Sequence, residues 1–197
     1  MRIVGGKFRG RALVRPAGRS TRPTSDRARE AVFNILAHAP WSPEIGGRRV
    51  LDLFAGSGAL GFEALSRGAA FVLFVDTDAA ARGAIRENIE ALGLFGVSRL
   101  HRRDATDLGL KPAGLGAPFD LVFLDPPYGQ GLGETALQRI IEGQWIAPDA
   151  LVVFECGAEE EPETPGFELL DTRDYGAAKV LFLSPIPGLR AAQVRGP

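Results

Sequence analysis

The chain has 197 residues, 45% hydrophobic and 24% charged, with a net charge of −1, which is the composition of one ordinary globular domain, residues 1–197. It contains no apolar run of about 18 residues that could span a membrane and no apolar N-terminal export signal, so we expect a cytoplasmic protein. A lone cysteine, Cys156, excludes an internal disulfide, and the histidines His38 and His101 lack ligand spacing, so we expect no metal.

The first part of the chain, residues 1–40, is predicted to be a basic extension made of a short hairpin and a helix. Segments 2–4 and 11–14 could pair around Gly5-Gly6 and Gly10. A helix should then begin at Pro23-Thr24 and end before two prolines, Pro40 and Pro43. Its expected apolar stripe consists of Ala28, Val32, Ile35 and Leu36.

Charge is distributed unevenly along the chain. Residues 1–29 carry a net charge of +8, and the remaining residues carry −9. A basic segment on an acidic body predicts a polyanionic partner, and arginine is well suited to phosphates and stacked bases. Arginine outnumbers lysine 20 to 3, for which a GC-rich or heat-adapted genome is the alternative explanation. We favour nucleic acid as the partner.

From residue 50 onward, strands alternate with helices. Strands are expected over 50–54, 71–75, 99–103, 120–124, 151–155, 167–171 and 180–184, with helices over 60–67, 81–92 and around 137–141. Repeated strand-helix units predict a mostly parallel sheet that is covered by helices on both faces. The last two strands, around Tyr175-Gly176, have no helix between them and predict antiparallel pairing. The acidic run 159–163 is interpreted as plain exposed surface.

A glycine motif lies between the first strand and the helix that follows it. Gly56, Gly58 and Gly61 form G-x-G-x-x-G, and Asp76 follows Gly56 by 20 residues, so the dinucleotide fingerprint is complete. A nicotinamide enzyme is therefore one alternative. Asp52 favours S-adenosylmethionine instead, because a carboxylate attracts an ammonium and a sulfonium but repels a pyrophosphate. Too few residues follow Asp125 for a dehydrogenase substrate domain.

A second motif, Asp125-Pro126-Pro127-Tyr128, directly follows the strand predicted at 120–124. At the carboxyl end of that strand it should lie beside the cofactor crevice. The Asp125 carboxylate and the Pro126 carbonyl could accept the two hydrogens of an exocyclic base amine and direct its lone pair at a methyl donor. Tyr128 could stack on the base. Asp104, after the third strand, is the expected acceptor for the adenine amino group of the cofactor.

These motifs, together with the N-terminal blocks Arg2-Ile3-Val4-Gly5-Gly6 and 22–30, resemble the RsmD family of bacterial 16S rRNA guanine-N2 methyltransferases over nearly the whole chain. The resemblance implies a Rossmann-like, seven-stranded class I S-adenosylmethionine-dependent methyltransferase fold with an antiparallel C-terminal strand. It also implies a monomer that acts on guanine 966 of 16S rRNA in the assembled or assembling 30S subunit. Asp76 departs from the glutamate expected in many relatives, although either acid can hold a ribose diol.

The motifs and the resemblance together predict three groups of site residues. The catalytic group is Asp125, Pro126, Pro127 and Tyr128. The cofactor-binding group is Thr24, Asp52, Phe54, Ala55, Gly56, Gly58, Asp76, Thr77, Asp104 and Ala105. The RNA-binding group is Lys7, Arg9, Arg11 and Arg22. Three alternatives stay open: an N6-adenine DNA methyltransferase, which normally has a separate target-recognition region, a NAD-dependent oxidoreductase, and a non-catalytic RNA-binding module.

Overall fold

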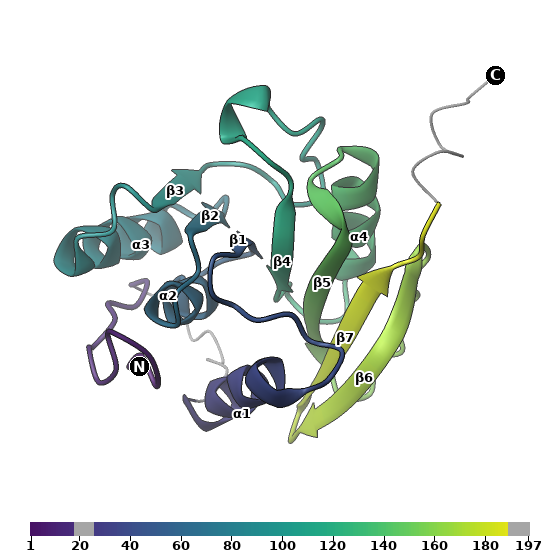
Figure 1. The fold of residues 1–197 in the computed structure, drawn as a ribbon, viewed down its shortest axis with the longest axis horizontal. Coiled ribbons are helices and arrows are strands. Elements are labelled where there is room, and N and C mark those ends of the chain that lie inside the picture. Colours follow the sequence, from purple (N-terminus) through teal and green to yellow (C-terminus); the bar gives the residue numbers. More distant parts are fainter. Residues whose placement is uncertain (18–25, 189–197) are drawn as a thin grey trace. The chain divides into compact units, whose positions relative to one another are not determined.

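The computed structural model of the protein describes residues 1–17 and 26–188 (Figure 1). The chain divides into two compact units, Met1–Arg103 and Asp104–Pro197. Together they contain the strands of a seven-stranded, mostly parallel sheet, which confirms the predicted fold class. The predicted helix start at Thr24 lies outside the described residues, and the expectation of a single domain stays a prediction.

The first unit alternates helices and strands in the order α1 (Asp26–His38), β1 (Arg49–Leu53), α2 (Ala59–Ser66), β2 (Phe71–Val75), α3 (Ala79–Leu92) and β3 (Ser98–His101). Its strands are parallel and lie in the order β3-β2-β1, with Leu51 opposite Leu73 and Leu73 opposite Arg99. In β1 and β2, every residue but the first is buried, as expected for strands covered on both faces. Each element predicted from residue 50 to residue 103 is confirmed to within a few residues.

Helix α1 ends at His38, before Pro40, as predicted. Val32 and Leu36 of the predicted apolar stripe are buried. The buried face also includes Phe33 and, unexpectedly for a charged side chain, Arg29. Arg29 therefore belongs to the interior of this unit and not to its basic surface.

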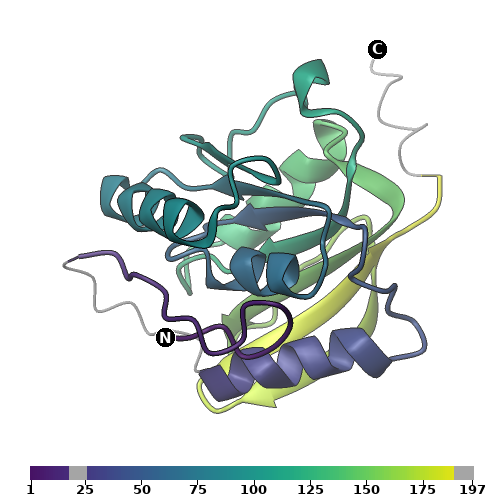
Figure 2. The same cartoon turned by 60° about the vertical axis from the view of Figure 1, so that its left-hand side comes forward.

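The N-terminal segment, residues 1–17, forms a smaller hairpin than predicted. It has one antiparallel bridge, between Arg2 and Ala12, with hydrogen bonds from Ile3 N to Arg11 O and from Gly10 N to Ile3 O. Ile3 and Leu13 are buried, so the segment is packed onto the unit. Figures 1 and 2 show it (purple) lying beside α2.

The second unit contains a 3-10 turn, η1 (Ala113–Leu115), and then β4 (Phe119–Leu124), α4 (Leu132–Glu142), β5 (Ile146–Gly157), β6 (Phe167–Tyr175) and β7 (Ala178–Pro185). The strands lie in the order β4-β5-β7-β6. β4 and β5 are parallel, whereas β7 pairs antiparallel with both β5 and β6. The predicted antiparallel closing hairpin is thus confirmed. β5 is longer than predicted because its first residues, among them the exposed Pro148 and Asp149, show no apolar pattern.

Candidate active site

The turn after β1 has an unusual backbone. Phe54, Gly56 and Gly58 have φ values of 55°, 56° and 75°, in the left-handed region. A left-handed phenylalanine is strained, and such strain is concentrated at functional sites. The space beside Gly56 is open, since a Cβ built there would meet only the Phe54 carbonyl oxygen, at 3.9 Å. The turn therefore leaves its backbone accessible to a ligand before α2 begins at Ala59.

Asp76 follows the last residue of β2 and links this turn to the loop that precedes α3. Its Oδ2 accepts a hydrogen bond from Gly56 N, and its Oδ1 accepts one from Asp78 N, both at 2.8 Å. Each carboxylate oxygen has a second lone pair, so a pair of hydroxyl groups could still be bound. Asp76 is 8% exposed, which is enough for contact with a ligand from one side.

Asp52 lies differently from what its proposed attraction to a charged cofactor suggested. Its carboxyl is 2% exposed, and its Oδ2 accepts a hydrogen bond from Gly61 N at 3.0 Å. Burial raises the pKa of Asp52 well above its ordinary value. A Cβ at Gly61 would lie 2.3 Å from the Phe74 ring and 2.9 Å from Asp52 Oδ2, so only glycine lets α2 approach the sheet this closely.

Three other predicted cofactor residues lie on loops. Thr77 is exposed, and its carbonyl accepts a hydrogen bond from Arg82. Asp104, in the second unit, is exposed, and its Oδ1 accepts bonds from Thr106 N at 2.8 Å and Thr106 Oγ1 at 2.6 Å. Ala105 is buried. The two predicted site residues Thr24 and Arg22 lie outside the described part of the chain.

The Asp-Pro-Pro-Tyr loop, residues 125–131, begins where β4 ends and reaches Gly131, the N-cap of α4. Asp125 is half-buried, Pro126 is buried and Pro127 is exposed. Tyr128 is 36% exposed, but its hydroxyl donates a 2.6 Å hydrogen bond to Glu155 Oε1. Burial and this bond raise the pKa of Tyr128, so the hydroxyl stays a neutral donor. Tyr128 thus has a partner for its hydroxyl as well as an accessible ring.

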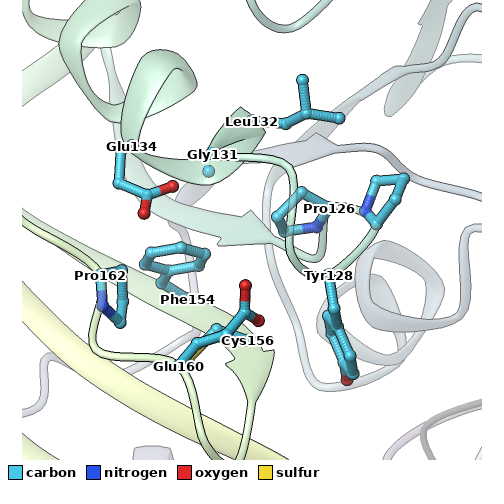
Figure 3. A pocket seen from close by; sticks show the side chains of 11 residues that line it. Pro126, Tyr128, Gly131, Leu132, Glu134, Phe154, Cys156, Glu160 and Pro162 are labelled. Carbon is cyan, nitrogen blue, oxygen red and sulfur yellow. The ribbon is translucent and has the colours of Figure 1, made fainter.

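A small pocket, partly open to solvent, lies beside this loop (Figure 3). Its lining includes Pro126, Tyr128, Phe154 and Cys156, and Glu160 reaches it from the acidic run 159–163. Glu160 Oε1 accepts a 2.6 Å hydrogen bond from Gly129 N, and Oε2 accepts one from Gly157 N. The interpretation of this run as plain surface is therefore wrong for Glu160, because backbone amides of the Asp-Pro-Pro-Tyr loop and of the end of β5 converge on its carboxylate. Burial raises the pKa of the Cys156 thiol to about 11, as expected for an unreactive cysteine.

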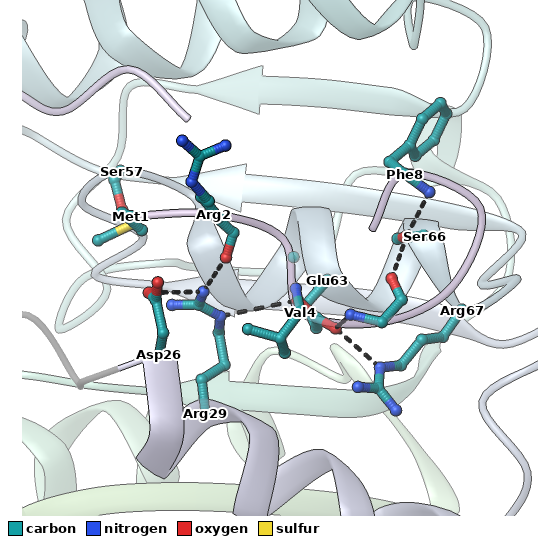
Figure 4. A network of polar contacts seen from close by, with 12 residues as sticks. Met1, Arg2, Val4, Phe8, Asp26, Arg29, Ser57, Glu63, Ser66 and Arg67 are labelled. Carbon is teal, nitrogen blue, oxygen red and sulfur yellow. Dashed lines mark hydrogen bonds and ion pairs between the residues drawn. The ribbon is translucent and has the colours of Figure 1, made fainter. Parts of the chain in front are cut away.

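The N-terminal basic segment is held by a buried carboxylate that the sequence did not reveal. Glu63 of α2 is 0% exposed, and its two oxygens accept hydrogen bonds from Val4 N and Gly5 N, both at 2.8 Å (Figure 4). Its Oε1 also lies 2.9 Å from Arg67 Nε, and its Oε2 lies 3.7 Å from Arg29 Nε. The only signal for this role was an acid in the otherwise apolar helix sequence 59–66.

Ser66, one turn further along α2, completes the attachment. Its backbone oxygen accepts a 2.7 Å bond from Lys7 N. Its hydroxyl accepts a 2.9 Å bond from Phe8 N and donates a 2.6 Å bond to Gly5 O. The predicted RNA-binding side chains Lys7, Arg9 and Arg11 are exposed, and they belong to a fixed loop and not to a free arm. The guanidinium of Arg11 also donates a 3.2 Å hydrogen bond to Ala91 O of α3.

Two kinds of site are not seen in the described residues. Within 1–17 and 26–188, no group of three or more histidine, cysteine or acidic side chains could hold a metal ion. None of the described helices is long and apolar enough to cross a membrane.

Comparison with known proteins places these motifs in a family. A family model described as Conserved hypothetical protein 95 matches residues 1–184. YlbH of Bacillus subtilis, named provisionally as an rRNA methyltransferase, is 41% identical over 91% of this chain and 96% of its own length. Ribosomal RNA small subunit methyltransferase D of Escherichia coli is 38% identical over 81% of this chain and 76% of its own.

The same similarity is found in three dimensions. A solved Escherichia coli structure, described provisionally as the methyltransferase yhhF, has a TM-score of 0.78 and 35% identity, and the match covers 94% of this chain and 97% of that one. It supports the class I methyltransferase fold. The match to the family model and the two sequence relatives show that this chain belongs to the Conserved hypothetical protein 95 family, the RsmD family.

Proposed function

We propose that the protein transfers a methyl group from S-adenosylmethionine to the exocyclic N2 amine of a guanine in 16S rRNA, acting in the cytoplasm as a monomer on the small ribosomal subunit. The observation that carries the proposal is the Asp-Pro-Pro-Tyr loop at the end of β4, in a chain of this family. The names of the relatives support an rRNA substrate.

The first unit fits the methionine nucleoside that such a reaction requires. The open space beside Gly56 and the fixed carboxylate of Asp76 would receive the nucleoside, with Asp76 binding the ribose hydroxyls. Phe54, Ala55, Gly58 and Thr77 would line the same turn. That Asp104 and Ala105 of the second unit bind the adenine stays a prediction. The burial of Asp52 weakens the residue-based argument against NAD, so membership of the family now carries the preference for S-adenosylmethionine.

The second unit supplies the groups that prepare the target amine. The bound cofactor contributes an electrophilic methyl group. Asp125 and the Pro126 carbonyl would accept the two amine hydrogens, which localises the nitrogen lone pair and fixes the direction of attack. Pro126 and Pro127 restrict the backbone and carry no N–H that could compete for these acceptors. The exposed ring of Tyr128 would stack on the base.

The first prediction concerns the cofactor. S-adenosylmethionine should bind and NAD should not, and Asp76→Ala should weaken binding by about 1–3 kcal/mol, since a charged acceptor of hydroxyl groups is lost. Isothermal titration calorimetry measures both. Asp78→Ala removes a neighbouring carboxylate that accepts a hydrogen bond from Ala81 N at the start of α3, so it is the control for a general effect on this loop. Binding of NAD alone would overturn the proposal.

The second prediction concerns the basic segment. Replacing Lys7, Arg9 and Arg11 with alanine should lower the slope of rRNA affinity against salt by about two units, at about 0.7 for each phosphate contact. Affinity for S-adenosylmethionine should not change, because these side chains are exposed and the segment is attached through its backbone. A filter-binding titration from low to high salt gives the slope. A normal slope would show that the three charges do not touch RNA.

The reaction itself is tested with labelled S-adenosylmethionine and three substrates in parallel: unmodified small ribosomal subunits, naked 16S rRNA and duplex DNA. The modified nucleoside is then identified by mass spectrometry. We expect N2-methylguanosine, with the subunit as the preferred substrate. N6-methyladenine in DNA would replace this proposal with the adenine methyltransferase alternative.

A further inference from the structure

We infer that Glu155 and Glu160 are positioning residues for methyl transfer, which hold the Asp-Pro-Pro-Tyr loop in the shape that receives the target base. The inference rests on the proposed function. Glu160 belongs to the acidic run 159–163, and Glu155 belongs to β5. The contacts of these two carboxylates with the loop suggest the positioning role.

The two carboxylates hold consecutive residues of the loop. Glu155 Oε1 accepts the hydrogen bond of the Tyr128 hydroxyl at 2.6 Å, and Glu160 Oε1 accepts that of Gly129 N, also at 2.6 Å. One contact fixes the ring that would stack on the base, and the other fixes the peptide that follows it. Tyr128 can therefore turn neither about its side chain nor with its backbone unless one of these bonds breaks.

Beyond Pro126 and Pro127, the loop has little else in its own sequence to fix this shape. Gly129 and Gly131 have φ values of 72° and 64°, and a Cβ at either would meet no atom within 4 Å. Glycines with open surroundings sample many conformations at little cost. Gly131 caps α4 without a side-chain hydrogen bond. A loop of this kind needs partners from elsewhere in the fold, and the two glutamates provide them.

Glu160 is itself held firmly. Its Oε2 accepts a bond from Gly157 N at the end of β5, and its backbone N donates to Gly157 O at 3.0 Å. Its carbonyl accepts a 2.7 Å bond from Lys179 Nζ of β7. Glu155 lies within β5 and is 8% exposed. Both carboxylates are thus held by paired strands, and their hydrogen bonds in turn fix the loop.

The far end of the loop is fixed by packing. A Cβ at Gly133 would lie 2.2 Å from the Phe154 ring, so the first turn of α4 rests directly on β5. Phe154 and Cys156 line the pocket beside the loop, and Glu160 points toward it (Figure 3). Between β4 and the packed first turn of α4, the two carboxylates bind Tyr128 and Gly129.

The test compares Glu160→Gln with Glu159→Gln. A glutamine at 160 keeps one acceptor oxygen and so can satisfy only one of the two amides that Glu160 binds. Glu159 is exposed, and its replacement makes the same charge change one residue away. Glu155→Gln tests the hydrogen bond between the Tyr128 hydroxyl and Glu155 in the same way.

Two measurements are made on each full-length variant. Hydrogen–deuterium exchange of the peptide covering 125–132 should become about tenfold faster in Glu160→Gln, because a neutral glutamine removes the charge assistance of the bond to Gly129 N and must share its one oxygen between two amides. Single-turnover methylation of small subunits with labelled S-adenosylmethionine should be about ten- to a hundredfold slower, since a misplacement of about 1 Å can cost about a hundredfold. The affinity for S-adenosylmethionine and the thermal unfolding of Glu159→Gln should match those of the unchanged protein.

The possible results distinguish a failure of this inference from a failure of the proposed function. If exchange of 125–132 and turnover in Glu160→Gln both equal those of Glu159→Gln, the carboxylate does not position the loop and the inference is wrong. A lower unfolding temperature with an unchanged single-turnover rate would also overturn it, because Glu160 would then only stabilise its own turn. If the unchanged protein methylates no nucleic acid, the proposed function fails, while the exchange data still decide whether Glu160 holds the loop.

Discussion

Replacing Asp125 with alanine should lower methyl transfer by about a hundred- to a thousandfold, the usual cost of losing one group aimed at the reacting atoms. The amine would keep one acceptor, the Pro126 carbonyl, and its lone pair would stay delocalised in the ring. The loss should appear in the single-turnover rate with small subunits and not in the affinity for rRNA. Asp125 lies just beyond the last residue of β4 and is half-buried, so the core of the strand is unaffected.

Two variants complete this test. Asp125→Asn keeps one acceptor oxygen and should retain more activity than alanine. Asp149→Ala removes an exposed aspartate from β5 of the same unit and should have no effect on rate. If Asp125→Ala transfers methyl groups as fast as Asp149→Ala, the carboxylate has no part in the chemistry.

The structure also changes what is expected of Tyr128. If Tyr128 only stacked on the base, Tyr128→Phe would hardly change the rate of methyl transfer and Tyr128→Ala would lower it. Because the hydroxyl donates to Glu155, which is 8% exposed, phenylalanine would remove a donor from a buried carboxylate. We therefore expect a clear loss of rate in Tyr128→Phe, smaller than that in Tyr128→Ala.

Sequence patterns predict the elements of this fold well. All seven strands were predicted, most clearly the buried ones, which contain apolar runs such as 71–75. The third glycine of the motif, Gly61, packs closely on Phe74, where no room is left for a side chain. These features depend on local pattern, and local pattern is visible in one sequence.

The polar contacts that hold the N-terminal segment and the Asp-Pro-Pro-Tyr loop could not be predicted from the sequence. Glu63, Glu155 and Glu160 bind backbone amides or a hydroxyl 27 to 59 residues away in the chain. Their partners are ordinary N–H groups, which every residue but proline has, so no residue type marks the contact. Asp52 shows the same limit, because only the fold shows that its carboxyl is bonded to Gly61 N and not turned toward solvent.

Gly6 and Gly10 allow the attachment of the basic segment to be tested with one matched pair. Both have left-handed φ values, 73° and 84°, so alanine costs about 1–2 kcal/mol of backbone strain at either position. At Gly6 the new Cβ would lie 1.9 Å from the Ser66 carbonyl oxygen, whereas at Gly10 it would meet nothing within 4 Å. Only Gly6→Ala should therefore push the segment off α2.

Detaching the basic segment from α2 should change rRNA binding in a different way from removing its charges. Gly6→Ala would break the bonds from Lys7 N and Phe8 N to Ser66 but keep every basic side chain. The slope of rRNA affinity against salt should then stay near normal, while affinity falls by tenfold or more, because ordering even a few freed residues on binding costs about 1–2 kcal/mol each. Gly10→Ala should bind rRNA almost normally. Equal affinities for the two variants would show that RNA does not use the fixed shape of this segment, and that its charges act as a flexible cluster.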